Sequence, residues 1–319
     1  MRAIKPYAKI MEGDIDVLKK IELVGRTCYK STDLIKDGSA ARFVSNLIKN
    51  GHEAMLEHAS FCFEINYTTY RVMMDTIETL STKSGFRSFM RFTNGRRILV
   101  SGNVRTWRDY FRHLVTCYQL PSCFKDLIQN NPVLFPEWQS DDLFETYNIG
   151  EMKPVHADDL KNDLEVYVHN DVTVRFIVDR GISHEIVRHR PASFAQESTR
   201  YCNYAKDKFG SQITFIIPEF FNEGSEELNY WLKCMEQTEK LYLKLMKNGV
   251  TPEKARSILP HSLKTELIMT ANCMEWYHFF DLRACNKTGK AHPQMLEVSV
   301  PLLNEFKEKV PVVFDGLTY

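Results

Sequence analysis

Apolar residues recur at helical spacing in several stretches of the chain. Asp14 precedes the first stretch as a helix cap, and Asn50–Gly51 ends the second. Thr251–Pro252–Glu253 begins another helix, because a hydroxyl cap precedes a proline and an acid of the first turn. Helices are therefore predicted over residues 14–29, 40–49, 226–249, 262–279 and 291–308, with a further one starting at residue 251.

Alternating apolar and polar positions predict strands over residues 59–67, 171–181 and 211–220. In the second strand one face carries Val172, Val174, Phe176 and Val178. A short helix is predicted over residues 182–190, since the residue before Pro191 avoids helical angles. Helices with a few separated strands favour the α+β class over a regular alternation of strands and helices.

Residues 68–168 have a mixed pattern that we interpret as a mainly helical insertion in a single domain spanning residues 1–319. Residues 70–80 and 105–120 have helical spacing, and residues 130–142 form a loop. The aromatic residues of the insertion predict a small core of its own: Phe86, Phe89, Phe92, Trp107, Tyr110 and Phe111. For the insertion, a structural role is favoured over that of a lid.

The overall composition argues against several classes of protein. Lys+Arg and Asp+Glu both number 41, so the net charge is zero and nonspecific binding to long nucleic acids is disfavoured. No window approaches the ~20 apolar residues of a membrane span, and residues 1–18 do not resemble a secretory signal. The eight cysteines form no CxxC pair. A cytoplasmic location with reduced thiols is expected.

The stretch RHRPASFAQESTRY, residues 188–201, concentrates polar chemistry. On the predicted helix, Glu185, Arg188 and His189 share one face. The planar guanidinium of arginine can bind phosphate oxygens with two parallel hydrogen bonds. One interpretation is therefore that this stretch binds a phosphorylated small molecule. The alternative is an exposed basic loop neutralised by Glu185 and Glu197. Ser198 with His189 as its base would be a nucleophile, although a phosphate-binding hydroxyl is the simpler interpretation.

Other charged and polar side chains lie among apolar neighbours. Arg256 and Arg283 must there either reach water or be paired, by a ligand or by an internal salt bridge. His52 and His58 do not have a common zinc spacing, and His278 is by default a core histidine. Neither GxGxxG, GxxxxGK[ST] nor GxSxG occurs, so a Rossmann turn, a P-loop and a nucleophile elbow are not indicated.

The order Arg188-His189-Arg190, seven residues and Ser198, followed by TRY, resembles the signature of flavin-dependent thymidylate synthases. Three further segments are similar to family segments and occur in the family's order: NGHEAMLEHASFCF, ARSILP and TANCMEWYHFFDLRA. The resemblance covers about residues 14–67 and 169–310. Within the insertion, SGNVRTWRDYF is similar to a segment of longer family members.

This resemblance implies an α+β fold, with a small mixed sheet, a helical bundle and the helical insertion. It implies methylation of dUMP to dTMP, with methylenetetrahydrofolate as carbon donor and a tightly bound FAD that NADPH reduces. It also implies a homotetramer whose active sites combine several subunits. From the net charge and the lack of a long apolar window, neither nucleic acid nor a membrane is expected as a partner.

Carried over position by position, the resemblance assigns two sets of residues. The residues expected to bind FAD are His52, Arg188, His189, Arg190, Gln196, Asn272 and His278. The residues expected to bind dUMP are Glu185, Arg188, Ser198, Thr199, Arg200, Arg256 and Arg283. Arg283 is the expected catalytic residue, since a cation beside the uracil ring stabilises negative charge and raises electron density at C5. A cysteine nucleophile and a metal are not expected.

The chain departs from the family pattern in places. Ala54 and Gln196 replace residues that carry a hydroxyl or a charge in some members, and residues 284–291 have no clear counterpart, so His292 and Gln294 receive no role. Two alternatives stay open: a flavin enzyme acting on another pyrimidine nucleotide, and a nucleic-acid-binding module without catalysis.

Overall fold

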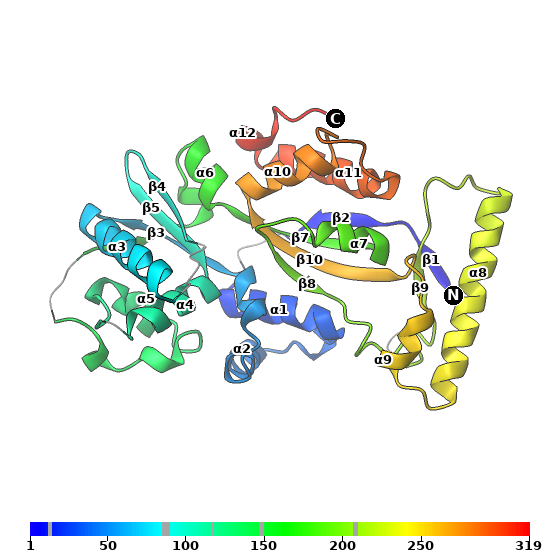
Figure 1. Ribbon diagram of the computed structural model, residues 1–319, viewed down its shortest axis with the longest axis horizontal. Helices are drawn as coiled ribbons and strands as arrows, with labels where there is room; N and C mark the ends of the chain where they lie inside the picture. Colours follow the sequence, from blue (N-terminus) through cyan, green and yellow to red (C-terminus); the bar gives the residue numbers. More distant parts are fainter. Residues whose placement is uncertain (12–14, 85–89, 117, 147–149, 207–209) are drawn as a thin grey trace.

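The computed structural model describes the chain except for residues 12–14, 85–89, 117, 147–149 and 207–209. The molecule is elongated, with a central sheet between a lobe built on β3–β5 and a long helix, α8, at the opposite end (Figure 1). Helices and sheets are both present and follow no regular strand–helix alternation, as the α+β prediction requires.

The central sheet has the order β2 (Tyr7–Ile10), β7 (Asp171–Asp179), β10 (Lys264–Asn272) and β8 (Ser193–Gln196), with antiparallel neighbours. The face of β7 that was predicted to be apolar lies in the main core. Above this face pack α7 (Arg180–Ile186), α10 (Cys273–Arg283), α11 (Pro293–Lys309) and α12 (Pro311–Phe314) (Figure 1). Trp276 of α10 is fully buried in this core.

The opposite face of the sheet is more polar and is covered by α1 (Val17–Tyr29) over β8 and β10. Val24 packs there against Ala195 and Ile268. A second helix, α2 (Ser39–Lys49), packs on α1 and ends at Asn50–Gly51, as predicted. This polar face continues to Thr270 and Asn272, at the end of β10.

The second lobe contains a four-stranded sheet with the order β4 (Arg91–Asn94), β5 (Ile98–Asn103), β3 (Ser60–Ile65) and β6 (Met152–Pro154). Its helices are α3 (Tyr67–Ser84), α4 (Val104–Leu114), α5 (Lys125–Gln129) and α6 (Asp163–His169). Trp107, Tyr110 and Phe111 are fully buried and Phe92 packs on them, which confirms those members of the predicted aromatic core. Phe86 and Phe89 lie outside the described residues.

The third part joins β1 (Arg2–Ile4), parallel to β9 (Thr214–Ile216), with α8 (Glu226–Lys247) and α9 (Pro252–Ala255). Its small core includes Phe215 and Tyr242. Short 3-10 helices complete the described structure: η1 (Thr32–Leu34), η2 (Glu53–His58), η3 (Ser122–Phe124), η4 (Pro136–Trp138), η5 (Asp141–Leu143), η6 (Ala157–Asp159) and η8 (Arg256–Ile258).

Several local predictions were wrong. The predicted helix 262–279 is a strand up to Asn272, because Thr265, Leu267, Met269 and Ala271 alternate onto the core face, and only its second half is α10. The helix predicted over 182–190 ends at Ile186, so Arg188 and His189 do not share a helical face with Glu185.

Other differences concern ends and short strands. The proposed cap Asp14 lies outside the described residues, and Asp16 caps α1, which begins at Val17. The strands that were not predicted, with three to six residues each, are β1, β2, β4, β5, β6 and β8.

Candidate functional site

The basic stretch begins in the loop between α7 and the edge strand β8 and runs through β8. Asp179 fixes the start of α7, because its carboxylate accepts a hydrogen bond of 2.9 Å from the Ile182 N–H. The chain then passes through Arg188, His189 and Arg190 and enters β8, which pairs with β10. The three basic residues are thus held at one edge of the central sheet.

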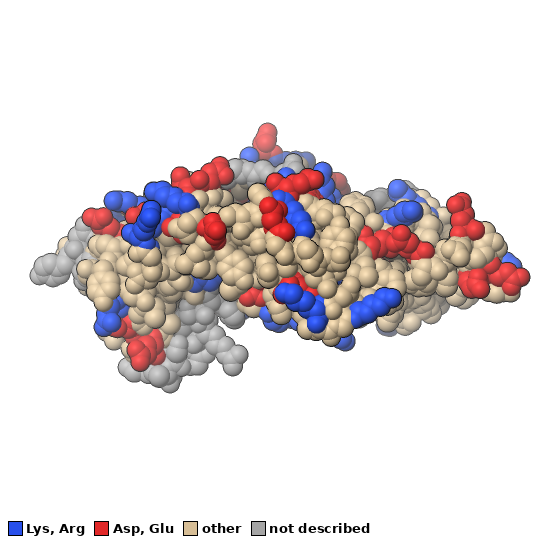
Figure 2. Space-filling model, turned by 90° about the horizontal axis from the view of Figure 1, so that it is seen from above, with Lys and Arg blue, Asp and Glu red and all other residues tan. Residues whose placement is uncertain are grey.

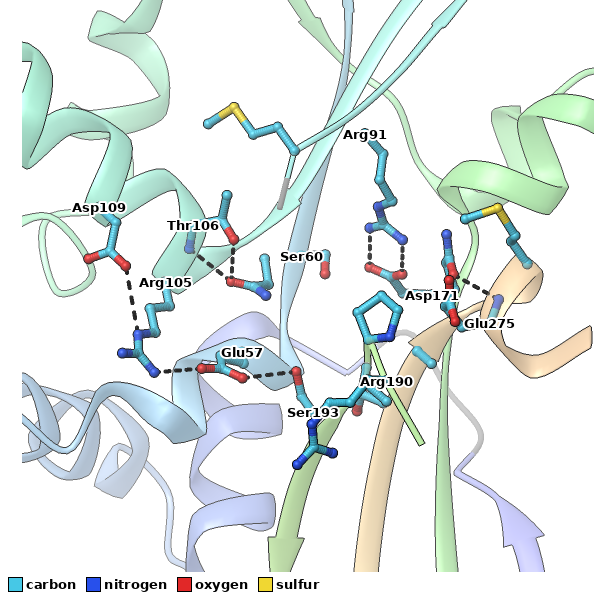
Figure 3. A pocket seen from close by; sticks show the side chains of 18 residues that line it. Glu57, Ser60, Arg91, Arg105, Thr106, Asp109, Asp171, Arg190, Ser193 and Glu275 are labelled. Carbon is cyan, nitrogen blue, oxygen red and sulfur yellow. Dashed lines mark hydrogen bonds and ion pairs between the residues drawn. The ribbon is translucent and has the colours of Figure 1, made fainter. Parts of the chain in front are cut away.

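The second lobe, which contains the insertion, is the insertion lobe. A cavity of about 470 Å³ lies where this lobe meets the edge of the central sheet (Figure 3). It is lined by Glu57, Ser60, Met90, Arg91, Asn103, Arg105, Thr106, Asp109, Asp171, Arg190, Pro191, Ala192, Ser193, Thr270, Ala271, Asn272, Met274 and Glu275. Of the residues predicted for the site, Arg190 and Asn272 line it. Its volume lies in the range of small-ligand sites.

Ion pairs join the two walls of the cavity (Figure 3). Arg91 binds Asp171 with both guanidinium nitrogens, at 2.5 and 2.8 Å. Arg105 Nη1 lies 2.6 Å from Glu57 Oε1, and Glu57 Oε2 accepts a hydrogen bond of 3.1 Å from the Ser193 hydroxyl. Burial raises the pKa of Asp171, but the adjacent Arg91 outweighs it and leaves that pKa lowered.

Asn272 and Glu275 form the start of α10 beside the cavity. Asn272 Oδ1 accepts from the Glu275 N–H at 3.1 Å, and its amide donates to the Val168 carbonyl at 2.9 Å. His189 Nε2 lies 3.0 Å from the Glu275 carbonyl oxygen. Burial, with His278 nearby, lowers the pKa of His189 to about 4, so its imidazole is neutral near pH 7.

A second contact joins α7 and α10. Arg283 Nη1 lies 3.4 Å from Glu185 Oε2, while the Arg283 Nε is buried and makes no hydrogen bond within the described residues. Both side chains are partly exposed, at 25% and 31%. Two residues that the resemblance assigns to the nucleotide thus lie side by side, and the guanidinium keeps hydrogen-bonding capacity for a ligand.

Four of the residues predicted to bind the nucleotide lie in the loop after β8 and near α9: Ser198, Thr199, Arg200 and Arg256. The Ser198 N–H donates to the Cys28 carbonyl at 3.0 Å, and Thr199 is buried. Arg200 Nε lies 3.3 Å from Glu253 Oε2 of α9. Arg256 follows at the start of η8 and is exposed, so of the two alternatives given for it, it reaches water.

The remaining predicted residues lie outside the lining of the cavity. His52 is exposed before η2, and Arg188 is exposed after α7. His278 is exposed, with its ring centroid 5.3 Å from that of His189, so it is not a core histidine. Gln196 donates to the Ser183 hydroxyl at 2.7 Å and thereby joins β8 to α7.

Within one chain, therefore, the predicted residues form separate groups. Arg190 and Asn272 face the cavity, Glu185, His189, His278 and Arg283 lie along α7 and α10, and the Ser198 loop lies near α9. Pattern analysis missed the contributions of Glu57, Arg105 and Glu275 to the cavity. No local pattern pointed to these three residues. The period-two alternation of residues 264–272 was a signal only for Thr270 and Asn272, since it places both on one face of a strand.

The thiols near the site are poor nucleophiles. Burial raises the pKa of both Cys28 and Cys285, and Cys202 is 1% exposed. Within the described residues, His, Cys, Asp and Glu side chains form no group of three that could hold a metal ion. His58, which was considered as a ligand, is buried and its Nδ1 lies 2.8 Å from the Thr270 hydroxyl.

The surface carries mixed charge. On the face shown in Figure 2, basic and acidic side chains are interspersed over the length of the molecule. This face therefore lacks the continuous basic surface that binds a nucleic-acid backbone. Over the part of the chain that is described, no helix has the length and apolarity to cross a membrane.

Comparison with known proteins gives consistent results. The family model described as thymidylate synthase complementing protein matches residues 11–79 and 161–312. A flavin-dependent thymidylate synthase of Pyrococcus abyssi (strain GE5 / Orsay) is 31% identical over 176 residues, which are 52% of this chain and 70% of that protein. One of Pyrococcus furiosus is 38% identical over 130 residues, 41% of this chain and 51% of that protein.

A structural comparison finds the crystal structure of a UMP/dUMP methylase, PolB, from Streptomyces cacaoi bound with 5-Br dUMP. It covers 99% of this chain and 96% of that chain, with 14% identity and a TM-score of 0.42. At this score the likeness supports no conclusion about the chain.

Proposed function

The chain belongs to the thymidylate synthase complementing protein family, and from this membership we propose that it is a flavin-dependent thymidylate synthase that converts dUMP to dTMP. The observation that carries the proposal is the family match over both segments of the sequence resemblance. The second matched segment contains the whole stretch from Arg188 to Ser198 and continues through Arg283.

The residues at the edge of the central sheet fit FAD. Arg190 lines the cavity, and its guanidinium donates to backbone carbonyls and lies over the Phe194 ring without a carboxylate partner among the described residues. Arg188 is exposed nearby. Such arginines suit the pyrophosphate of a dinucleotide, while the neutral His189 and the Asn272 amide suit a polar ring edge.

FAD reduced by NADPH supplies the reducing equivalents, and methylenetetrahydrofolate supplies the carbon. In this proposal Arg188, His189, Arg190 and Asn272 hold the cofactor, with His52, Gln196 and His278 as further contacts. Ser198, Thr199, Arg200 and Arg256 hold the nucleotide.

Arg283 is the proposed catalytic residue. Its guanidinium has unused donors beside Glu185, which would orient it. Placed against N3 and O2 of uracil, a fixed cation stabilises the negative charge that spreads over the ring and so makes C5 more nucleophilic. The raised thiol pKa values of Cys28 and Cys285 support activation without a cysteine adduct.

We propose that the enzyme is a homotetramer, as the family resemblance implies. The separation of the predicted residues within one chain supports this, because an active site made of several subunits would unite them. Size-exclusion chromatography with light scattering should then give four times the mass of one chain.

The test is a visible absorption spectrum of the purified protein, followed by anaerobic addition of NADPH with and without dUMP. A flavin spectrum that bleaches, faster with dUMP, and dTMP formation with methylenetetrahydrofolate would support the proposal. Turnover of another pyrimidine nucleotide in preference to dUMP would indicate the related flavin enzyme. A colourless protein that FAD does not reconstitute would contradict both enzyme hypotheses.

A further inference from the structure

One wall of the cavity comes from the part of the insertion lobe that lies outside the family match. Residues 80–160 fall between the two matched segments. Met90, Arg91, Asn103, Arg105, Thr106 and Asp109 of this stretch line the cavity opposite residues of the family segments. In Figure 3, Arg105 and Glu275 lie on opposite sides of the cavity.

Arginines of the insertion attach this wall to the segments that carry the predicted site residues. Arg105 is joined through Glu57 to Ser193, three residues after Arg190. Arg91 is paired with Asp171 at the start of β7.

A second pair of arginines, Arg108 and Arg112 of α4, binds Glu53, the residue that follows His52. Arg108 is fully buried, so this attachment is part of the packed interior. The position of the wall relative to the basic stretch is therefore fixed by several charged contacts at once.

Most charges lining the cavity neutralise one another. Arg91 is paired with Asp171, and Arg105 with both Glu57 and Asp109. Among the described residues, the Glu275 carboxylate has only the neutral His189 ring within ion-pair range, at 3.7 Å, and burial raises the pKa of Glu275. A hydrogen-bond acceptor without a firm partner is left facing the cavity.

Apart from Arg190, the rest of the lining is apolar or neutral. Its apolar residues are Met90, Met274, Pro191, Ala192 and Ala271. Methionine sulfur packs favourably on aromatic rings. A flat ring system with N–H donors along one edge matches this combination. Of the lining arginines, only Arg190 has no carboxylate partner among the described residues, so a phosphate would find a free cation at that edge alone.

We propose that the insertion completes a pocket for a fused nitrogen heterocycle, with Glu275 accepting from its N–H edge and Met90 and Arg105 forming the facing wall. The inference rests on the proposed function, which offers two such rings, those of FAD and that of the folate. It gives the insertion a direct part in ligand binding, beyond a structural role.

The test compares Glu275→Gln, Met90→Ala and Arg105→Ala with wild type and with Lys153→Ala, a charge removed from an exposed position of the same lobe. Dissociation constants for FAD and KM for methylenetetrahydrofolate are measured for each protein, and circular dichroism checks folding. Glu275→Gln keeps the side-chain size, and Met90→Ala removes no ion pair, so these two variants keep the test valid where Arg105→Ala fails to fold.

Glu275→Gln and Met90→Ala should weaken the same constant at least tenfold, while Lys153→Ala leaves both constants within twofold. A change in FAD affinity assigns the pocket to FAD, and a change in folate KM alone assigns it to the folate. Constants within twofold of wild type in either Glu275→Gln or Met90→Ala would overturn the inference. Wild-type protein that neither binds FAD nor forms dTMP would instead refute the proposed function.

Discussion

Arg283 at the end of α10 lies with its Nη1 3.4 Å from Oε2 of Glu185, on α7. A second nitrogen, Nη2, lies 3.5 Å from the Glu185 backbone carbonyl. Both contacts are long for charge-assisted hydrogen bonds, and Nε has no partner in the described part of the chain. The guanidinium is oriented by Glu185 and still has donors for a substrate carbonyl.

Replacing Arg283 with alanine should therefore abolish dTMP formation while the flavin stays bound, because the lost group acts on the uracil ring. The expected loss in kcat is at least a hundredfold, in line with removal of one charge-stabilising donor. Turnover assays and the flavin absorbance of the same preparation measure the two effects separately.

The matched control is Arg175→Ala, at an arginine of β7 that pairs with Glu266 away from this contact. It should retain turnover. Glu185→Gln should lower kcat more than it raises the KM for dUMP, because it loosens the orientation of Arg283. An active Arg283→Ala enzyme would exclude the proposed role.

Serine at Cys202 or Cys285 should leave activity largely intact. Burial raises the pKa of the Cys285 thiol, and Cys202 is buried, so neither provides an accessible thiolate at neutral pH. Steady-state kinetics should give kcat/KM within about threefold of wild type, since a structural thiol replaced by a hydroxyl costs little catalysis. Loss of all activity in either variant, with folding preserved, would favour covalent catalysis by cysteine.

The parts of the fold that could be predicted are those with a long periodic pattern. The strand at β7 and helices α1, α2, α8 and α11 carry many apolar residues in register, so their type was clear. β10 was mistaken for a helix because Leu267, Ile268 and Met269 place consecutive apolar residues on both faces of the strand, and no glycine or proline separates it from α10.

The candidate site was predictable only where residues are adjacent in sequence. Arg188 to Ser198 could be identified from spacing, whereas the Arg91–Asp171 pair joins residues 80 positions apart. Similarly, Glu57 and Ser193 meet only because β8 lies against η2. Such contacts depend on how the lobes pack, which local patterns do not encode.

Arg108→Ala should destabilise the protein by roughly 3–5 kcal/mol, the usual cost of removing one partner of a buried ion pair. Arg108 is 0% exposed, pairs with Glu53 and Glu137, and donates to the Leu134 carbonyl. The variant leaves all three acceptors without this partner. Denaturant unfolding measures the free energy.

The comparison variant is Arg71→Ala, whose exposed pair with Asp75 spans 3.6 Å. It should change the unfolding free energy by about 0.5 kcal/mol or less, because solvent screens exposed pairs. Equal effects of the two variants would show that burial of Arg108 does not govern its contribution.

Acid should destabilise the protein through buried histidines, and His169 offers a specific test. Its Nδ1 lies 2.8 Å from the Ser101 hydroxyl and its Nε2 2.9 Å from the Thr93 hydroxyl, so it joins α6 to β5 and β4. Burial lowers the pKa of His169 to about 4, whereas an unfolded histidine titrates near about 6.5.

As pH falls from about 6.5 to about 4, the unfolded chain takes up a proton at this position that the folded chain does not, so stability is lost over that window. A shift of this size corresponds to about 3 kcal/mol. Glutamine at position 169 keeps a donor and an acceptor but does not titrate. Unfolding free energies of wild type and His169→Gln are measured from pH 7.5 to 4.5. The difference in unfolding free energy between the two proteins should become smaller as the pH falls. Parallel curves would mean that His169 is protonated equally in the folded and unfolded states.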